Sequence, residues 1–165
     1  MINRTYAWLS AIAMLLSWPH MARAAVSCSV DASGVAFGVV DPLNGAPHDG
    51  VGNITVGCTW DGLGSADIAY VVNLSSGTGG TGILSRRLTA GAQGLSYNLY
   101  SSSDRSAVWG DGTTGAQSLS SGPWTLTSPN VQETRAHTMY GRIPGGQQTT
   151  PVGNYGDTVS VTISF

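Results

Sequence analysis

Apolar and polar side chains alternate residue by residue through much of the chain after residue 25, which is the period of a β-strand. The clearest apolar faces are Ile54, Val56 and Cys58; Ile68, Tyr70, Val72 and Leu74; Leu95, Tyr97 and Leu99; and Val159, Val161, Ile163 and Phe165. Shorter strand-like runs occur at 26–30, 34–40 and 135–144. No segment has a convincing helical period. We therefore predict six or seven short strands in one all-β domain, an antiparallel sandwich or barrel.

Glycine punctuates the chain between these runs, with 23 glycines in 165 residues, well above the usual share of about 7%. The segment 110–130 is rich in Gly, Ser, Thr and Pro, and we interpret it as a loop or a weak strand. Within it, residues 110–115 match G-x-G-x-x-G. Because no helix is predicted after this match, we interpret it as a turn rather than a dinucleotide fingerprint.

The first 24 residues have the pattern of a secretory signal peptide. Arg4 precedes an apolar run at 6–18, which Ala22, Arg23 and Ala24 follow as an A-x-A cleavage site. The apolar run falls short of the ~20 residues that a membrane-spanning helix needs. We predict cleavage after Ala24, export of the protein, and a mature domain of residues 25–165.

Charge is sparse, at 10% of the chain, and the sequence contains no lysine. Aspartate and glutamate outnumber arginine, nine to seven, so no basic stripe exists to neutralise phosphates. Nucleic acid is therefore excluded as an expected partner.

Two cysteines, Cys28 and Cys58, lie in the predicted exported domain. A disulfide is the default in an oxidising compartment, and closing a loop of roughly 30 residues would contribute about 3–4 kcal/mol. Free thiols or a metal pair remain as alternatives at this point, although a zinc site would need four ligands and only His48 and His137 could assist.

Catalytic motifs are weak. No G-x-S-x-G elbow accompanies the two candidate histidines, and Asp104 and Asp111, beside Ser and Gly, are typical of turns. Trp109 is predicted to fill core space. Trp60 and Trp124 lie beside loops and are candidates for a surface-binding role. The residues thus favour a non-enzymatic protein.

Five segments together carry a resemblance to a known family: "VAFGVVDPL", "GNITVGCTW", "LSYNLYSSSDRSAVWGDGT", "YGRIPGGQ" and "PVGNYGDTVSVTISF". They resemble the spore coat protein U domain, the pilin domain of archaic chaperone–usher pili. The resemblance implies an incomplete immunoglobulin-like sandwich that lacks its final strand. It also implies a periplasmic chaperone, an outer-membrane usher and a neighbouring pilin as partners, the last donating an N-terminal strand, with no cofactor and no membrane span after signal cleavage.

The same resemblance assigns roles to individual residues. It implies that Cys28 and Cys58 form a disulfide joining the first strand to the second. It places a row of apolar residues in the groove for the donor strand: Val159, Val161, Ile163 and Phe165. Arg142 and Asp157 fall on the motifs "GRIP" and "YxDT", and we expect them to be structural and ion-paired.

The chain departs from a polymerising pilin at its start. A donor strand needs roughly ten alternating residues, and the predicted cleavage leaves only Ala25, Val26 and Ser27 before Cys28. We expect a subunit that accepts a strand and donates none: a terminating or tip subunit on the cell surface, involved in adhesion and biofilm formation. The alternatives are a spore or cell-surface coat protein and an exported carbohydrate-binding module using Trp60 and Trp124.

Overall fold

The computed structural model describes residues 25–41, 43 and 45–165, and this part of the chain is built from strands. It contains one short 3-10 helix and no α-helix, so the prediction of an all-β fold is confirmed. The predicted signal peptide lies outside the described residues. Within them, no helix is long and apolar enough to cross a membrane. The elements are β1 (Val26–Ser33), β2 (His48–Trp60), β3 (Ala66–Leu74), η1 (Ile83–Ser85), β4 (Arg87–Ala90), β5 (Gln93–Ser96), β6 (Asn98–Tyr100), β7 (Leu119–Leu126), β8 (Glu133–Ile143) and β9 (Val161–Ser164).

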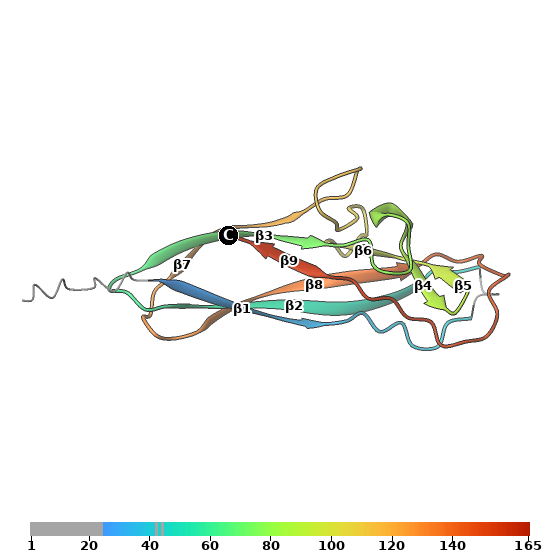
Figure 1. The fold of residues 1–165 in the computed structure, drawn as a ribbon, viewed down its shortest axis with the longest axis horizontal. Helices are drawn as coiled ribbons and strands as arrows, with labels where there is room; N and C mark the ends of the chain where they lie inside the picture. Colours follow the sequence, from blue (N-terminus) through green and yellow to red (C-terminus); the bar gives the residue numbers. More distant parts are fainter. Residues whose placement is uncertain (1–24, 42, 44) are drawn as a thin grey trace, which may run out of the picture.

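The strands form two antiparallel sheets and a hairpin, arranged as an elongated sandwich (Figure 1). One sheet has the order β1-β2-β8-β6 and the other β7-β3-β9, while β4 and β5 pair with each other. An immunoglobulin-like sandwich orders its strands A-B-E-D in one sheet, which β1-β2-β8-β6 reproduces. In the second sheet β3 and β9 take the places of strands C and F. No described strand takes the place of G beside β9.

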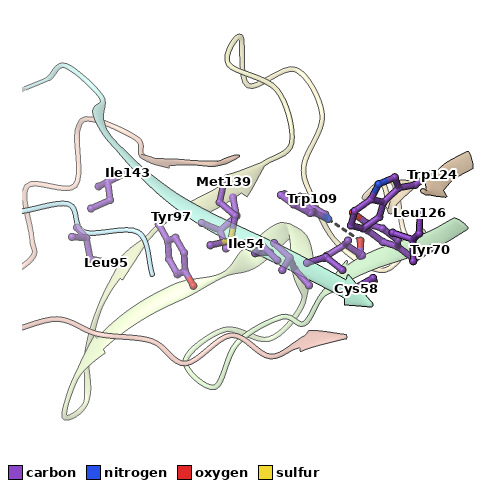
Figure 2. Close-up of a cluster of buried hydrophobic side chains, with 14 residues drawn as sticks. Ile54, Cys58, Tyr70, Leu95, Tyr97, Trp109, Trp124, Leu126, Met139 and Ile143 are labelled. Carbon is purple, nitrogen blue, oxygen red and sulfur yellow. Dashed lines mark hydrogen bonds between the residues drawn. The ribbon is translucent and has the colours of Figure 1, made fainter. Parts of the chain in front are cut away.

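The core lies between the two sheets and follows the alternation seen in the sequence. Ile54, Val56 and Cys58 of β2 are fully buried, as are Val72 and Leu74 of β3. Figure 2 shows part of this cluster, in which the indole of Trp109 donates a 2.9 Å hydrogen bond to the carbonyl of Val72. The prediction of Trp109 as a core residue is confirmed by its complete burial. Side chains of alternating strand positions thus meet in a single apolar layer.

Gly50 and Gly141, which we call the glycine platform, leave room for the segment after β1 to lie between the two sheets. Gly50 of β2 and Gly141 of β8 are direct partners in the register. A Cβ on Gly141 would lie 2.6 Å from Val35 Cγ1 and 2.7 Å from Phe37 Cζ, and a Cβ on Gly50 would lie 2.8 Å from the same Val35 atom. Because both positions lack side chains, Val35 and Phe37 pack into the hollow.

The structure differs from the sequence prediction in five places. The segment 34–40 forms no strand, the run 94–102 is split between β5 and β6, and the segment 119–126 is a full strand, β7, rather than a loop or a weak strand. The C-terminal strand β9 begins at Val161 rather than at Val159. The hairpin strand β4 was not predicted. The β7 strand forms despite its Gly122 and Pro123 because it is an edge strand, where a missing backbone donor is tolerated.

Candidate strand-acceptor groove

Among the described strands, the C-terminal strand β9 is an edge strand that pairs on one side only. It pairs with β3 over four residues, from Leu74 opposite Val161 to Val71 opposite Ser164. Val161 and Ile163 are half-buried and Thr162 and Ser164 are exposed, so the alternation read from the sequence is retained. Phe165 continues the apolar row and its ring lies 5.9 Å from that of Tyr70, yet it is 68% exposed. Phe165 is therefore a core-facing apolar residue that the described part of the chain leaves largely exposed.

The first strand β1 is the edge strand of the other sheet, and it also has a core-facing apolar side chain that remains exposed. Val30 lies opposite Val56 in the register, and Ala32 lies opposite Ile54. Directly opposed residues of an antiparallel pair share one face of the sheet, so Val30 and Ala32 face the core. Val30 is nevertheless 42% exposed, although its partner Val56 is fully buried. The opening of the sandwich therefore lies between β1 and β9.

Two adjoining hollows continue from the part of this opening that Ala32 of β1 and Val161 of β9 line. A groove of about 310 Å³ is lined by the end of β1, by Val35 and Phe37, and by Val159 and Val161 on the opposite wall. A second hollow of about 510 Å³ continues towards one end of the molecule, between residues 35–40 and 150–157. The two share four lining residues: Val35, Phe37, Leu88 and Asp157. They form one channel, which we call the acceptor groove.

Asp157 is the charged residue at the junction of the two hollows. Its Oδ1 accepts hydrogen bonds from the backbone N–H groups of Thr78 at 2.7 Å and Gly79 at 3.0 Å, and Oδ2 accepts one from Tyr97 Oη at 2.7 Å. Although burial raises the pKa of the Asp157 carboxyl, these hydrogen bonds outweigh it and the pKa lies below its usual value. Burial and the nearby carboxylate raise the pKa of Tyr97 strongly, so its hydroxyl remains a donor.

The expected ion pairing is found for Arg142, whereas Asp157 pairs with no cation in the described part of the chain. Arg142 forms a bidentate pair with Asp49 across the β2–β8 ladder, at 2.7 and 2.8 Å, and Arg105 joins the same carboxylate at 3.1 Å. Asp49 and Arg142 are direct neighbours in the antiparallel register, which the sequence motifs do not show. Asp157 instead binds the phenol of Tyr97 and the loop after β3.

The structure also corrects the interpretation of Trp124. It is 6% exposed, its ring lies 6.3 Å from Tyr70, and the guanidinium of Arg135 stacks over it at 5.0 Å. The segment 119–126 is the strand β7, and a register shift opposite Ile68–Tyr70 lets both Ser121 and Trp124 turn inwards. Trp60 is partly buried against the core, beside Gly62 of the following loop.

Cys28 and Cys58 form a disulfide and are direct partners between β1 and β2. The two aspartates predicted to lie in turns stabilise turns: Asp111 accepts hydrogen bonds from Thr113, and Asp104 accepts one from the N–H of Ser106.

Residues on the wall opposite β9, Val35 and Phe37 above all, were not predicted to line the groove. Apolar residues alternate along 34–40 in the sequence, and this pattern is the signal that could have identified them.

These features define a class of protein: a small disulfide-bonded all-β domain with a sandwich that is open along one edge. A family model described as the Spore Coat Protein U domain matches residues 15–162. The chain therefore belongs to the spore coat protein U domain family. The search of curated proteins found no match.

Among solved structures, the chain is similar to one described as the crystal structure of the CsuC-CsuE chaperone-tip adhesion subunit pre-assembly complex from archaic chaperone-usher Csu pili of Acinetobacter baumannii. The identity is 23% and the TM-score is 0.49. The match covers 86% of this chain and 40% of that chain, so this chain spans less than half the length of that structure's chain.

Proposed function

We propose that this chain is a non-enzymatic subunit of an archaic chaperone–usher pilus, and that its acceptor groove receives a β-strand from another protein. The observation that carries the proposal is the pair of open edges: Val30 on β1 and Phe165 after β9 face the core side but remain exposed. A strand inserted between β1 and β9 would cover both. This is β-augmentation, in which the backbone supplies hydrogen bonds and alternate side chains supply register.

Family membership supports the same proposal, with a periplasmic chaperone as the first strand donor, an outer-membrane usher as the assembly site and a neighbouring pilin as the final donor. The protein would then be exported through the periplasm to the cell surface. Until it meets a donor, an open apolar edge of this kind is an aggregation hazard, so the chain would depend on the chaperone for its yield.

The deciding experiment is expression of the full chain in the periplasm with and without a chaperone encoded beside its gene. We expect soluble protein only with the chaperone, as a one-to-one complex from which an alternating strand peptide releases the subunit. A matched control is Val51→Thr, an exposed outer-face change on β2 that should leave complex formation unaltered. A stable monomer that needs no partner and binds no such peptide would contradict the proposal.

We further propose that the subunit terminates the pilus at its tip, with a role in adhesion and biofilm formation. β1 begins at Val26 and is paired with β2 from its first residue, so the residues directly after the predicted cleavage site are already part of the sandwich. They are therefore not available as a donor strand. N-terminal sequencing of the exported protein tests this directly: cleavage before Ala24 that leaves ten or so alternating residues would make the chain a donor as well.

A further inference from the structure

Asp157 is the one charged residue among the described residues that line the acceptor groove. Asp157 precedes Val159 and Val161 in the row of alternate residues that faces the groove, and all three line the smaller hollow. Asp157 also lines the larger one. A strand that fills the channel would therefore cover this carboxylate together with the valines.

The two carboxylate oxygens of Asp157 accept different numbers of hydrogen bonds. Oδ1 accepts from the N–H of Thr78, Gly79 and Thr158 and from the Thr78 hydroxyl, at 2.7 to 3.0 Å. Within the described part of the chain, the hydrogen bond to Oδ2 comes from Tyr97. Since a carboxylate oxygen offers about two acceptor sites, Oδ2 retains one.

The nearest buried cation does not fill that site. Arg86 is 1% exposed, and its guanidinium donates to the carbonyls of Ser75 and Trp109 and to the side chain of Asn98. It offsets the charge of Asp157 at a distance without occupying Oδ2. A covering strand that placed an apolar side chain there would desolvate a charged oxygen and give it nothing in return, which is costly.

We propose that the carboxylate of Asp157, oriented by Tyr97, forms a polar subsite that fixes the register of the incoming strand, by accepting a hydrogen bond from a hydroxyl or ammonium side chain on that strand. This inference rests on the proposed strand-acceptor function and specifies the partner's chemistry. A polar contact within an apolar interface is a known way to select one register over its alternatives.

The geometry gives the partner a pattern. Side chains on neighbouring strands face each other at every second residue, so four apolar residues of the donor would face Phe165, Ile163, Val161 and Val159. The next alternate residue would face Asp157 and would carry the hydrogen-bond donor. A slip of two residues would place an apolar group on Asp157 and the polar group on Val159, and is therefore disfavoured.

The test uses the full chain, purified as its complex with the chaperone, and measures how tightly labelled synthetic peptides of about eleven residues bind the chain as they displace the chaperone. Each has valine at four alternate positions, residue X at the fifth, and threonine, lysine and glutamate at the outward positions. The series is made with X at either end of the valine row, because either strand direction is to be covered. We expect serine or lysine at X to bind about tenfold more tightly than alanine or valine in one of the two directions.

The composition control is a peptide in which the serine at X and one inner valine exchange places. It should lose the tighter binding that serine at X provides. In Asp157→Asn the advantage of lysine over alanine at X should fall, because the carboxylate charge is gone. Tyr97→Phe keeps the bonds of Asp157 to Thr78 and Gly79, frees Oδ2, and should increase the preference for serine over alanine. If the peptides bind and are indifferent to X, the polar subsite is wrong and strand acceptance stands. If no alternating peptide binds the folded chain, strand acceptance itself fails.

Discussion

Arg86 donates a 2.8 Å hydrogen bond from Nη1 to Oδ1 of Asn98, and both side chains are buried. The same guanidinium donates to the carbonyl of Ser75 from Nε at 2.9 Å and from Nη2 at 2.7 Å, and from Nη2 to the carbonyl of Trp109 at 2.9 Å. It thus connects the end of β3, the start of β6 and the residue Trp109 that fills the core. A charged residue holds together the region beneath the acceptor groove.

Replacement of Arg86 by methionine should therefore destabilise the domain by at least about 3 kcal/mol, because several buried carbonyl groups lose their donor at once. Arg87, the next residue, is exposed and provides the matched control. Arg87→Met should change the free energy of unfolding by no more than about 0.5 kcal/mol. Urea denaturation of the two variants, each released from the chaperone by the same alternating peptide, measures the difference, and equal midpoints would contradict the role given to Arg86.

The glycine platform predicts a size-dependent defect at position 141. Gly141→Ala should cost about 1–3 kcal/mol, because the new Cβ would overlap Val35 and Phe37. Gly122→Ala is the control, since no atom of the described residues lies within 4 Å of a Cβ built at that position. Adding Val35→Ala to Gly141→Ala should recover part of the loss. If thermal melting shows no such recovery, the defect does not come from crowding by Val35.

Trp124 should behave as a core residue in mutagenesis. Trp124→Ala is expected to lower the free energy of unfolding by about 3–5 kcal/mol, as for other buried tryptophans. The control, Leu63→Ala, removes a side chain that is 97% exposed and should have almost no effect. A Trp124 variant that unfolds at the same denaturant concentration as the unmodified protein would restore the view that the indole is exposed.

Acid should weaken the domain through Asp157. Its pKa is depressed below 3.8 in the folded protein, so the stabilisation it provides is fully present above that value. The stabilisation is lost as the pH falls below 3.8 and through the lower folded-state pKa. Melting temperatures measured from pH 6 to pH 2 should therefore fall less steeply for Asp157→Asn than for the unmodified protein. Asp31→Asn, at an exposed position of β1, should reproduce the unmodified profile.

The strands with strict alternation could be predicted from the sequence because one face of each lies on the core. Ile54, Val56 and Cys58 of β2 follow this rule without exception. The alternation at 34–40 has the same pattern but a different cause. There Val35 and Phe37 point into a hollow between the sheets while the backbone pairs with no strand, a distinction that only the tertiary position of Gly50 and Gly141 decides.

The groove was half predictable for a similar reason. The apolar row at Val159 and Val161 is a local pattern, and the structure places both in the groove wall. The partner of Asp157 is Tyr97, 60 residues away, and the partner of Arg142 is Asp49, 93 residues away. Such pairs depend on strand order and register, which no local pattern contains. Trp124 was misplaced because glycine and proline beside it concealed an edge strand.

The disulfide between Cys28 and Cys58 fastens the edge strand β1 to the interior strand β2 at a point where they are direct neighbours. If a partner strand lies between β1 and β9, tension along the assembled fibre reaches each subunit through these two edges. Hydrogen bonds of an edge strand can be peeled apart one after another, whereas a covalent bridge cannot. The disulfide would transmit the tension from β1 to β2 and then to β8, so that the whole sheet resists it.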